Sequence, residues 1–150
     1  MKKNKLLLVS SSGGHFEQLR MIKPLLTEYE GVVVTEKTKI NNEADYYLIQ
    51  NGHKERFFFT KMLLNTVKAF GIMLKEKPNV IISTGTSIIF PFVLWAKLKK
   101  CKIIYIETFA RIHDCTRTGK VMYKYADLFI VQWESLLDFY PNAVYGGSIY

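Results

Sequence analysis

The chain has 150 residues, of which 49% are hydrophobic and 23% charged, a balance typical of one globular domain and not of a disordered segment. Two cysteines exclude a disulfide framework, and the C-x-x-C and H-E-x-x-H metal motifs are missing, so we expect a reducing compartment and no metal. Twenty-one Lys and Arg against thirteen Asp and Glu give a net charge of +8, which favours partners that carry phosphate.

The N-terminus combines a basic start with a short apolar run, residues 6–9, as signal peptides do. Serines and glycines follow without a cleavage-site pattern, so we expect this run to form a buried strand. The longest apolar run, 88–96, has nine residues, whereas a membrane-spanning helix needs about twenty. We therefore expect a cytoplasmic protein that is soluble or peripheral on a membrane.

Short apolar runs alternate with longer segments of helical periodicity along the rest of the chain. Strands are expected over residues 5–10, 31–36, 46–50, 80–83, 102–106 and 127–131, with a last one near Val144. Helices are expected over residues 14–29 with a kink at Pro24, 60–77, 87–100 and 119–125, and a short helix before the last strand. This alternation predicts an α/β fold with a doubly wound, Rossmann-like parallel sheet, which binds ligands beyond the carboxyl ends of its strands.

The loop after the first strand reads Ser-Ser-Ser-Gly-Gly-His over residues 10–15. Its glycines allow a tight turn, and the following helix N-terminus offers unpaired N–H groups. Ser12, Gly13 and Gly14 are therefore candidates for binding a phosphate or a sugar. The alternative is a tight turn with a serine N-cap and a packed His15. Glu36 would suit the ribose of a dinucleotide, but the loop lacks the G-x-G-x-x-G pattern.

Two further loops follow the fourth and fifth strands. Thr84, Gly85 and Thr86 form a small, hydroxyl-rich turn that can hydrogen-bond a sugar or phosphate; a simple helix N-cap is the alternative. Glu107 ends the fifth strand and can orient or deprotonate a sugar hydroxyl. Arg111 can pair with Glu107 or hold a diphosphate, and an ordinary surface ion pair is the alternative.

Two segments combine apolar residues with lysines, a composition that suits contact with an anionic membrane. The candidate membrane contacts are Lys61, Lys68, Trp95, Lys97, Lys99 and Lys100. The alternative is core packing with a solvated rim of charge. Nucleic acid is disfavoured as a partner because the lysines are scattered and no RNP, zinc or helix-turn-helix pattern is present.

The order and spacing of these segments resemble the acceptor-side subunit of split glycosyltransferases, over nearly the whole chain. The resemblance rests on the loop ending at His15, on residues 78–85, on 105–107 with Arg111, on 118–120, on 126–133 and on 144–147. The family includes the membrane-recruiting subunit of the eukaryotic dolichol-linked UDP-N-acetylglucosamine transferase. The chain also resembles, and more closely, bacterial capsule and exopolysaccharide proteins such as the enhancer subunits of β-1,4-galactosyltransferases.

The resemblance implies the N-terminal half of a GT-B glycosyltransferase, present as a single acceptor-binding domain over residues 1–150. Its implied partners are a separate donor-binding subunit, a UDP-sugar held by the complex, a polyprenyl-diphosphate-linked sugar acceptor and the inner face of the cell membrane. His15 and Gly13-Gly14 would face the cleft near the diphosphates. Glu107 would correspond to a glutamate in the N-acetylglucosaminyltransferase of peptidoglycan synthesis. Neither a metal nor a cofactor is expected.

Two hypotheses of function follow. In the first, the chain is a subunit of an inverting UDP-sugar transferase of capsule or exopolysaccharide assembly, with Glu107 as the acid or base and His15 as the alternative base. In the second, it is a non-catalytic adaptor that recruits and activates a partner glycosyltransferase at the membrane. A nucleotide-binding oxidoreductase is a more distant, third alternative.

Overall fold

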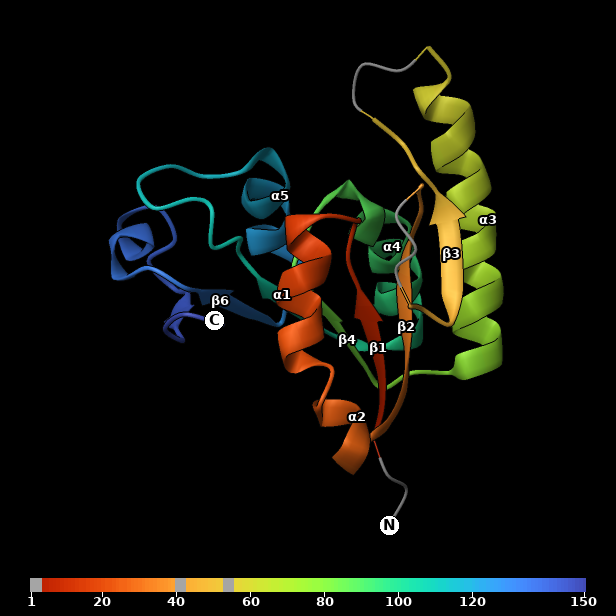
Figure 1. Cartoon of the computed structure of the whole chain (residues 1–150), viewed down its shortest axis with the longest axis horizontal. Helices are drawn as coiled ribbons and strands as arrows, with labels where there is room; N and C mark the ends of the chain where they lie inside the picture. Colours follow the sequence, from red (N-terminus) through yellow and green to blue (C-terminus); the bar gives the residue numbers. More distant parts are fainter. Residues whose placement is uncertain (1–3, 40–42, 53–55) are drawn as a thin grey trace.

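The computed structural model describes residues 4–39, 43–52 and 56–150, and a parallel sheet lies at its centre. The strands are β1 (Lys5–Val9), β2 (Glu30–Lys37), β3 (Tyr46–Ile49), β4 (Val80–Ser83), β5 (Lys102–Ile106), β6 (Leu128–Val131) and β7 (Val144–Tyr145). Their order across the sheet is β3-β2-β1-β4-β5-β6-β7, and all neighbours are parallel (Figure 1). The predicted doubly wound α/β sheet is therefore confirmed.

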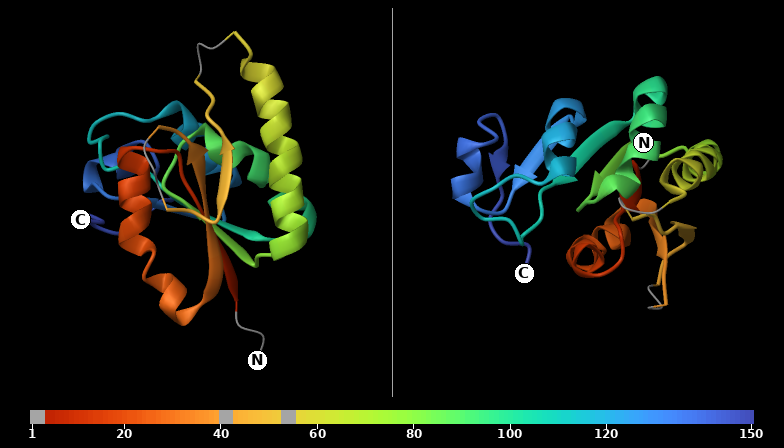
Figure 2. Two further views of the ribbon diagram at one scale, coloured as in Figure 1. Left: turned by 45° about the vertical axis from the view of Figure 1, so that its right-hand side comes forward. Right: turned by 90° about the horizontal axis from the view of Figure 1, so that it is seen from above.

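Helices cover both faces of the sheet. They are α1 (Gly14–Ile22), α2 (Leu25–Glu28), α3 (Phe58–Glu76), α4 (Phe90–Lys99) and α5 (Arg117–Tyr125), with two short 3-10 helices, η1 (Ser87–Ile89) and η2 (Glu134–Asp138). Residues of β1 alternate between two cores, because successive side chains of a strand point to opposite faces. Leu8 packs with residues of α1, whereas Leu7 packs in the core with residues of α3, α4 and α5. Figure 2 shows α1 on one face of the sheet and α3 and α4 on the other.

Prolines explain where the helices differ from the prediction. The expected helix over 14–29 is divided into α1 and α2 at Pro24, which has no N–H to continue the helical ladder. The expected helix over 87–100 begins as η1 and becomes α-helical at Phe90, with Pro91 in its first turn, where a missing N–H is tolerated. Helix α3 ends next to Pro78 as expected, through Lys77 with a φ of 48°.

The sheet has a switch point between β1 and β4. The chain places β2 and β3 on one side of β1, and α3 then leads back to β4 on the other side. In doubly wound sheets, ligands bind in a crevice at the carboxyl edge of the strands, at such a point. Because β4 separates β1 from β5, His15 and Glu107 follow strands that are not adjacent, and a prediction that these two strands are neighbours in the sheet is wrong.

The edge strand β3 is covered by α3. The buried Asn65 accepts a hydrogen bond from the Ile49 N–H and donates one to the Ile49 carbonyl, both at 2.8 Å. One side chain thus takes the place of a neighbouring strand and protects this edge from pairing with another chain.

Candidate functional site

The loop after β1 carries the helix N-terminus at the switch point. Gly13 is the N-cap of α1, with a φ of 79°, and no side chain caps the helix. A Cβ atom built on Gly13 or Gly14 meets nothing within 4 Å, so open space lies beside both residues. The alternative of a serine N-cap is therefore wrong, and the helix end suits an anion.

The loops after β1 and β4 are joined by reciprocal hydrogen bonds. The Thr84 hydroxyl donates to the His15 carbonyl at 2.7 Å, and His15 Nδ1 lies 2.7 Å from the Thr84 carbonyl. The Ser11 N–H donates to the Gly85 carbonyl at 3.1 Å. Gly85 has a φ of 108°, and a Cβ there would lie 2.8 Å from His15 Nδ1. The Thr84 hydroxyl, which was predicted to bind a sugar or phosphate, is buried and donates its hydrogen to the protein backbone instead.

His15 is oriented by its contact with Thr84. A carbonyl oxygen only accepts hydrogen bonds, so Nδ1 must carry the hydrogen of this contact. In the neutral imidazole, Nε2 then holds the lone pair. The ring is half-buried at the opening of α1, and one nitrogen is therefore fixed by the protein while the other is left as an acceptor.

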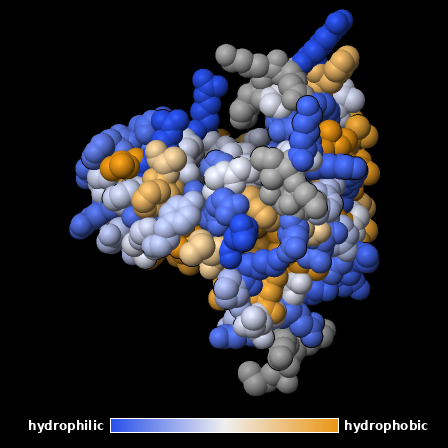
Figure 3. Space-filling view, viewed as in Figure 1, coloured by the Kyte–Doolittle hydropathy of each residue, from blue (hydrophilic) through white to orange (hydrophobic). Residues whose placement is uncertain are grey.

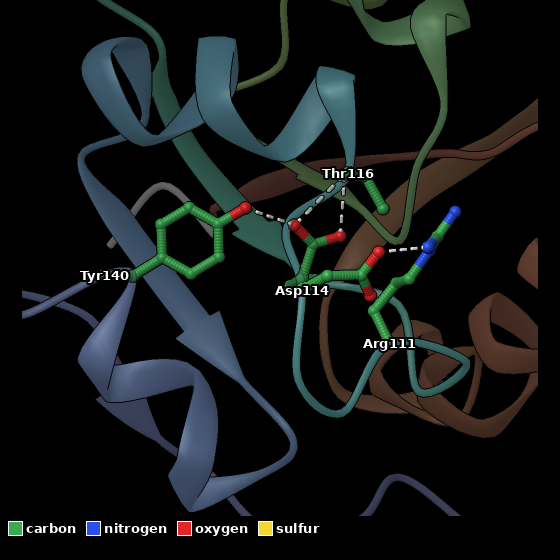
Figure 4. Close-up of polar contacts among 5 residues, drawn as sticks. Arg111, Asp114, Thr116 and Tyr140 are labelled. Atoms are coloured by element: carbon green, nitrogen blue, oxygen red, sulfur yellow. Dashed lines mark hydrogen bonds and ion pairs between the residues drawn. The ribbon is translucent and has the colours of Figure 1, made fainter.

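Glu107 lies directly after β5, and its residue has 0% exposed surface. The Tyr140 hydroxyl donates to Oε2 at 2.7 Å, and the Thr108 N–H donates to Oε1 at 3.0 Å. The Thr116 hydroxyl lies 3.0 and 3.1 Å from the two carboxylate oxygens (Figure 4). Donors therefore surround the carboxylate, as a buried charge requires. Proton transfer by Glu107 stays a prediction, since in this structure the carboxylate is not exposed at the crevice.

Gly119 in the first turn of α5 makes room for this carboxylate. A Cβ there would lie 1.7 Å from Glu107 Oε2 and 2.6 Å from the Tyr140 oxygen. Thr116 is the N-cap of α5 and accepts a hydrogen bond from the Gly119 N–H at 2.7 Å. The positive end of α5 therefore stabilises the buried charge. Burial raises the pKa of the Tyr140 phenol, and its hydrogen bond to Glu107 raises that pKa further, which keeps the phenol a donor.

Arg111 pairs with Asp114 on the exposed loop between β5 and α5 (Figure 4). Both side chains are about half exposed. Of the alternatives, pairing with Glu107 is therefore wrong, because that carboxylate is enclosed by Thr116 and Tyr140, and Arg111 forms a surface ion pair instead. A role of Arg111 in holding a diphosphate stays a prediction.

The structure also reveals a buried amide pair that the sequence did not indicate. Gln132, directly after β6, donates to Gln18 Oε1 at 2.7 Å and to the Glu107 carbonyl at 2.9 Å. Gln18 on α1 also accepts from the Phe109 N–H at 3.2 Å and donates to the Thr108 hydroxyl at 3.3 Å. The pair thus fixes α1, which begins with Gly14 and His15, against the loop after β5.

The candidate membrane residues do not lie on one surface. Lys61 and Lys68 line a hollow beside β3. Trp95 is half-buried; its ring packs 4.2 Å from that of Phe70, and its Nε1 donates to the Thr66 carbonyl at 3.2 Å. The remaining candidates are exposed lysines at the end of α4: Lys97, Lys99 and Lys100.

An exposed apolar face lies instead on the outer side of α3 and on α4, and along α3 its members are spaced by four or seven residues. This α3–α4 apolar face consists of Phe59, Leu63, Val67, Leu74, Leu94 and Leu98. Phe59 is 85% exposed and Leu63 is 66% exposed. Apolar surface is visible along the right-hand edge of Figure 3, where α3 lies. Among the described residues, no helix is long and apolar enough to cross a membrane.

The chemistry available at the crevice is therefore that of an oriented imidazole beside an open helix N-terminus. In residues 4–39, 43–52 and 56–150, no group of three or more His, Cys, Asp or Glu side chains is placed to hold a metal ion.

A family model described as "Oligosaccharide biosynthesis protein Alg14 like" matches residues 57–149. The chain belongs to this Alg14-like family.

Relatives of this Alg14-like chain carry a transferase name. It is 27% identical over 177 residues to the UDP-N-acetylglucosamine transferase subunit ALG14 of Rattus norvegicus, covering 96% of this chain and 82% of the relative. The protein of the same name from Yarrowia lipolytica is 28% identical, with 97% and 81% covered. The Candida albicans protein is 40% identical over 83 residues, or 51% of this chain. The expected resemblance to the eukaryotic subunit is therefore confirmed at the level of the family.

Solved structures show the fold that Alg14-like chains share with larger proteins. UDP-N-acetylglucosamine 2-epimerase from Rickettsia bellii superposes with a TM-score of 0.74 at 16% identity, over 98% of this chain and 45% of that chain. MurG from Acinetobacter baumannii superposes with a TM-score of 0.68 at 16% identity, over 85% and 41%. The Alg14-like chain thus spans less than half the length of these proteins and matches their Rossmann-like architecture.

Proposed function

We propose that this chain is the acceptor-binding subunit of a two-component, UDP-sugar-dependent glycosyltransferase. A separate subunit would bind the UDP-sugar, and the acceptor would be a sugar linked to a polyprenyl diphosphate. The observation that carries the proposal is the open, uncapped N-terminus of α1 next to the oriented imidazole of His15. The printed names of the relatives, which describe transferase subunits, support it.

In the proposed reaction, His15 acts as the general base. Its Nε2 takes the proton of an acceptor hydroxyl, whose oxygen forms a bond to the anomeric carbon as the bond from that carbon to UDP breaks. Departing UDP keeps the electron pair of the broken bond and is held by the donor-binding subunit, and the anomeric configuration inverts. The Ser12-Gly13-Gly14 turn would bind the acceptor diphosphate at the positive end of α1.

Thr86 and Gly85 remain candidates for contact with the acceptor sugar, and Arg111 for contact with a diphosphate. The adaptor hypothesis keeps one supporting observation, the enclosure of Glu107 away from the crevice. Reconstitution of transfer with a donor-binding subunit tests the transferase proposal, and substitution of His15 separates a catalytic subunit from an adaptor.

We also propose that the complex works as a peripheral assembly on the inner face of the cell membrane, in capsule or exopolysaccharide synthesis. A polyprenyl-linked acceptor keeps its lipid in the bilayer, so the crevice must lie close to the lipid surface. The α3–α4 apolar face suits this contact because it starts near the amino end of α3, at the carboxyl edge of the sheet (Figure 1). Lys97, Lys99 and Lys100 would add attraction to anionic lipid.

The membrane contact predicts a loss of vesicle binding when the apolar face is made polar. Replacing Leu63 and Val67 by Ser should weaken cosedimentation with anionic vesicles at least about ten-fold, because a buried apolar side chain contributes about 1.5–3 kcal/mol. The fold should survive, since both side chains are exposed. Val144→Ser on β7, at the far edge of the sheet, is the matched control and should bind as the wild type does.

A second arm separates charge from apolar contact. Changing Lys97, Lys99 and Lys100 to Gln should weaken binding to anionic vesicles and leave binding to neutral vesicles unchanged, because each lysine contributes about 1 kcal/mol at an anionic surface. Equal binding by wild type, the double Ser variant and the Val144 control would refute a membrane role for this face.

A further inference from the structure

We infer that Glu107 is a positioning residue, which fixes the loop over residues 108–116 and the start of α5 at the crevice, and that it exchanges no proton with the acceptor. The inference rests on the proposed function, because the loop matters only if the acceptor binds at this edge of the sheet. Its evidence is the set of contacts around one buried carboxylate.

The carboxylate joins three segments that are separate in the sequence. Thr108 donates from the first residue of the loop, Thr116 from its last residue, and Tyr140 from the segment after η2. Both ends of the loop are therefore held at the same side chain. A carboxylate with no exposed surface, enclosed by these donors, cannot reach a hydroxyl of a bound sugar without breaking these contacts.

The loop is fixed at further points, and its outer part is open to solvent. Trp133 Nε1 donates to the Phe109 carbonyl at 2.8 Å, and the Ser135 hydroxyl donates to the Ile112 carbonyl. Residues 110–114 are nevertheless exposed, and they include Arg111 with Asp114. This loop follows β5, next to the loop of Thr84, so its conformation sets which polar groups face the acceptor.

A carboxylate suits this position better than a neutral side chain. Within the described parts of the chain, none of the ion pairs found involves Glu107. Its charge is instead stabilised by hydrogen bonds and by the N-terminus of α5, where Thr116 and Gly119 lie against it. Glutamine at this position would lose the negative charge and one of these hydrogen bonds, because its amide nitrogen donates where Oε2 now accepts from Tyr140.

The test compares Glu107→Gln, Thr116→Val and Tyr140→Phe in the complex of the full chain with its donor-binding subunit. If Glu107 positions the loop, all three variants should raise the KM for the acceptor, by about ten-fold for loss of a hydrogen bond to a charged group. Their kcat should change by less than about three-fold, and the shape of the pH–rate profile should not change. Thr116→Ser, which keeps the hydroxyl, should restore the wild-type KM.

A catalytic Glu107 gives a different pattern. Glu107→Gln would then lower kcat by roughly 10²–10⁴-fold and remove one limb of the pH–rate profile. Thr116→Val and Tyr140→Phe, which remove donors to the same carboxylate, would lower kcat and shift that limb, and the KM for the acceptor would not rise. That pattern would overturn the inference. Should Glu107→Gln fail to fold, the Thr116 and Tyr140 variants still decide, because positioning raises their KM at nearly constant kcat, whereas a catalytic Glu107 would lower their kcat.

Hydrogen exchange of the chain alone provides a readout that does not depend on activity. Amides of residues 108–116 should exchange faster in Tyr140→Phe and Thr116→Val than in the wild type, whereas the amides of β1 should not change. Unchanged exchange in the loop would contradict positioning. A wild-type complex without transferase activity would refute the proposed function instead, and the exchange result would still stand.

Discussion

Replacing His15 by Ala should lower kcat of the assembled complex by roughly 10²–10⁴-fold, the usual contribution of a positioned general base. The expectation follows from the hydrogen bond of Nδ1 to the Thr84 carbonyl, which leaves Nε2 as the proton acceptor beside the helix N-terminus. Steady-state kinetics with a UDP-sugar and a polyprenyl-diphosphate-linked acceptor measure the effect. Binding of the partner subunit should not change.

His15→Asn is the informative companion to this variant. The Asn amide can donate to the Thr84 carbonyl much as Nδ1 does, but it has no basic nitrogen. Both variants should therefore be equally slow if His15 is the base. Recovery of activity in His15→Asn would assign His15 a structural role, and normal kcat in both variants would favour the adaptor hypothesis.

Replacing Gly119 by Ala should destabilise the chain by at least about 3 kcal/mol. The added Cβ would lie 1.7 Å from Glu107 Oε2, so the carboxylate must move and lose its contacts with Tyr140 and Thr116. At this chain length, such a loss lowers Tm by roughly 6–12 °C. Thermal unfolding followed by circular dichroism measures it.

Gly71→Ala on α3 is the matched control, since it is also a helical glycine. Nothing lies within 4 Å of a Cβ built there. The substitution should stabilise the chain by about 0.5–1 kcal/mol, the difference in helix propensity between the two residues. A Tm for Gly119→Ala equal to that of wild type would show that the carboxylate is not packed against α5.

The sequence predicted the central strands β1, β4 and β5 because each is a short apolar run that is largely buried on both faces of a parallel sheet. The limits of β4 and β5 agree to the residue with the expected 80–83 and 102–106. Pro78 correctly predicted the end of α3, and Pro24 correctly predicted the break after α1. The loop of His15 was also placed correctly at the carboxyl edge, because it directly follows the first strand.

The surroundings of the site residues could not be predicted in this way, because they come from distant parts of the chain. Glu107 meets Tyr140 from 33 residues away, and Gln18 meets Gln132 from 114 residues away. A local pattern cannot tell a buried carboxylate from one in a crevice. The position of Gln18 did offer a clue, because this polar residue stands between Phe16 and Leu19, two apolar residues of α1 that are buried as Gln18 is.

The lysines of α3 lie at a different angle around the helix from the residues of the α3–α4 apolar face, and their contact with a membrane stays a prediction. Their seven-residue spacing places them on one line, but Lys61 is two residues after Phe59, or about 200° around the helix. The α3 residues of the α3–α4 apolar face therefore lie on a different side from Lys61 and Lys68, which line the hollow beside β3. Leu64, which is 48% exposed, lies between the two sets. Helical phase, applied to both sets, would have separated them.

The central claim is that this chain supplies the acceptor half of a transferase and that a second subunit supplies the donor half. The direct measurement incubates the chain, the donor-binding subunit, or both with UDP-N-acetylglucosamine and other UDP-sugars, in the presence of a polyprenyl-diphosphate-linked acceptor, and detects the extended lipid by mass spectrometry. Product should form when both proteins are present and not with either alone. Turnover by the chain alone, or no product from the complex with any UDP-sugar, would contradict the claim.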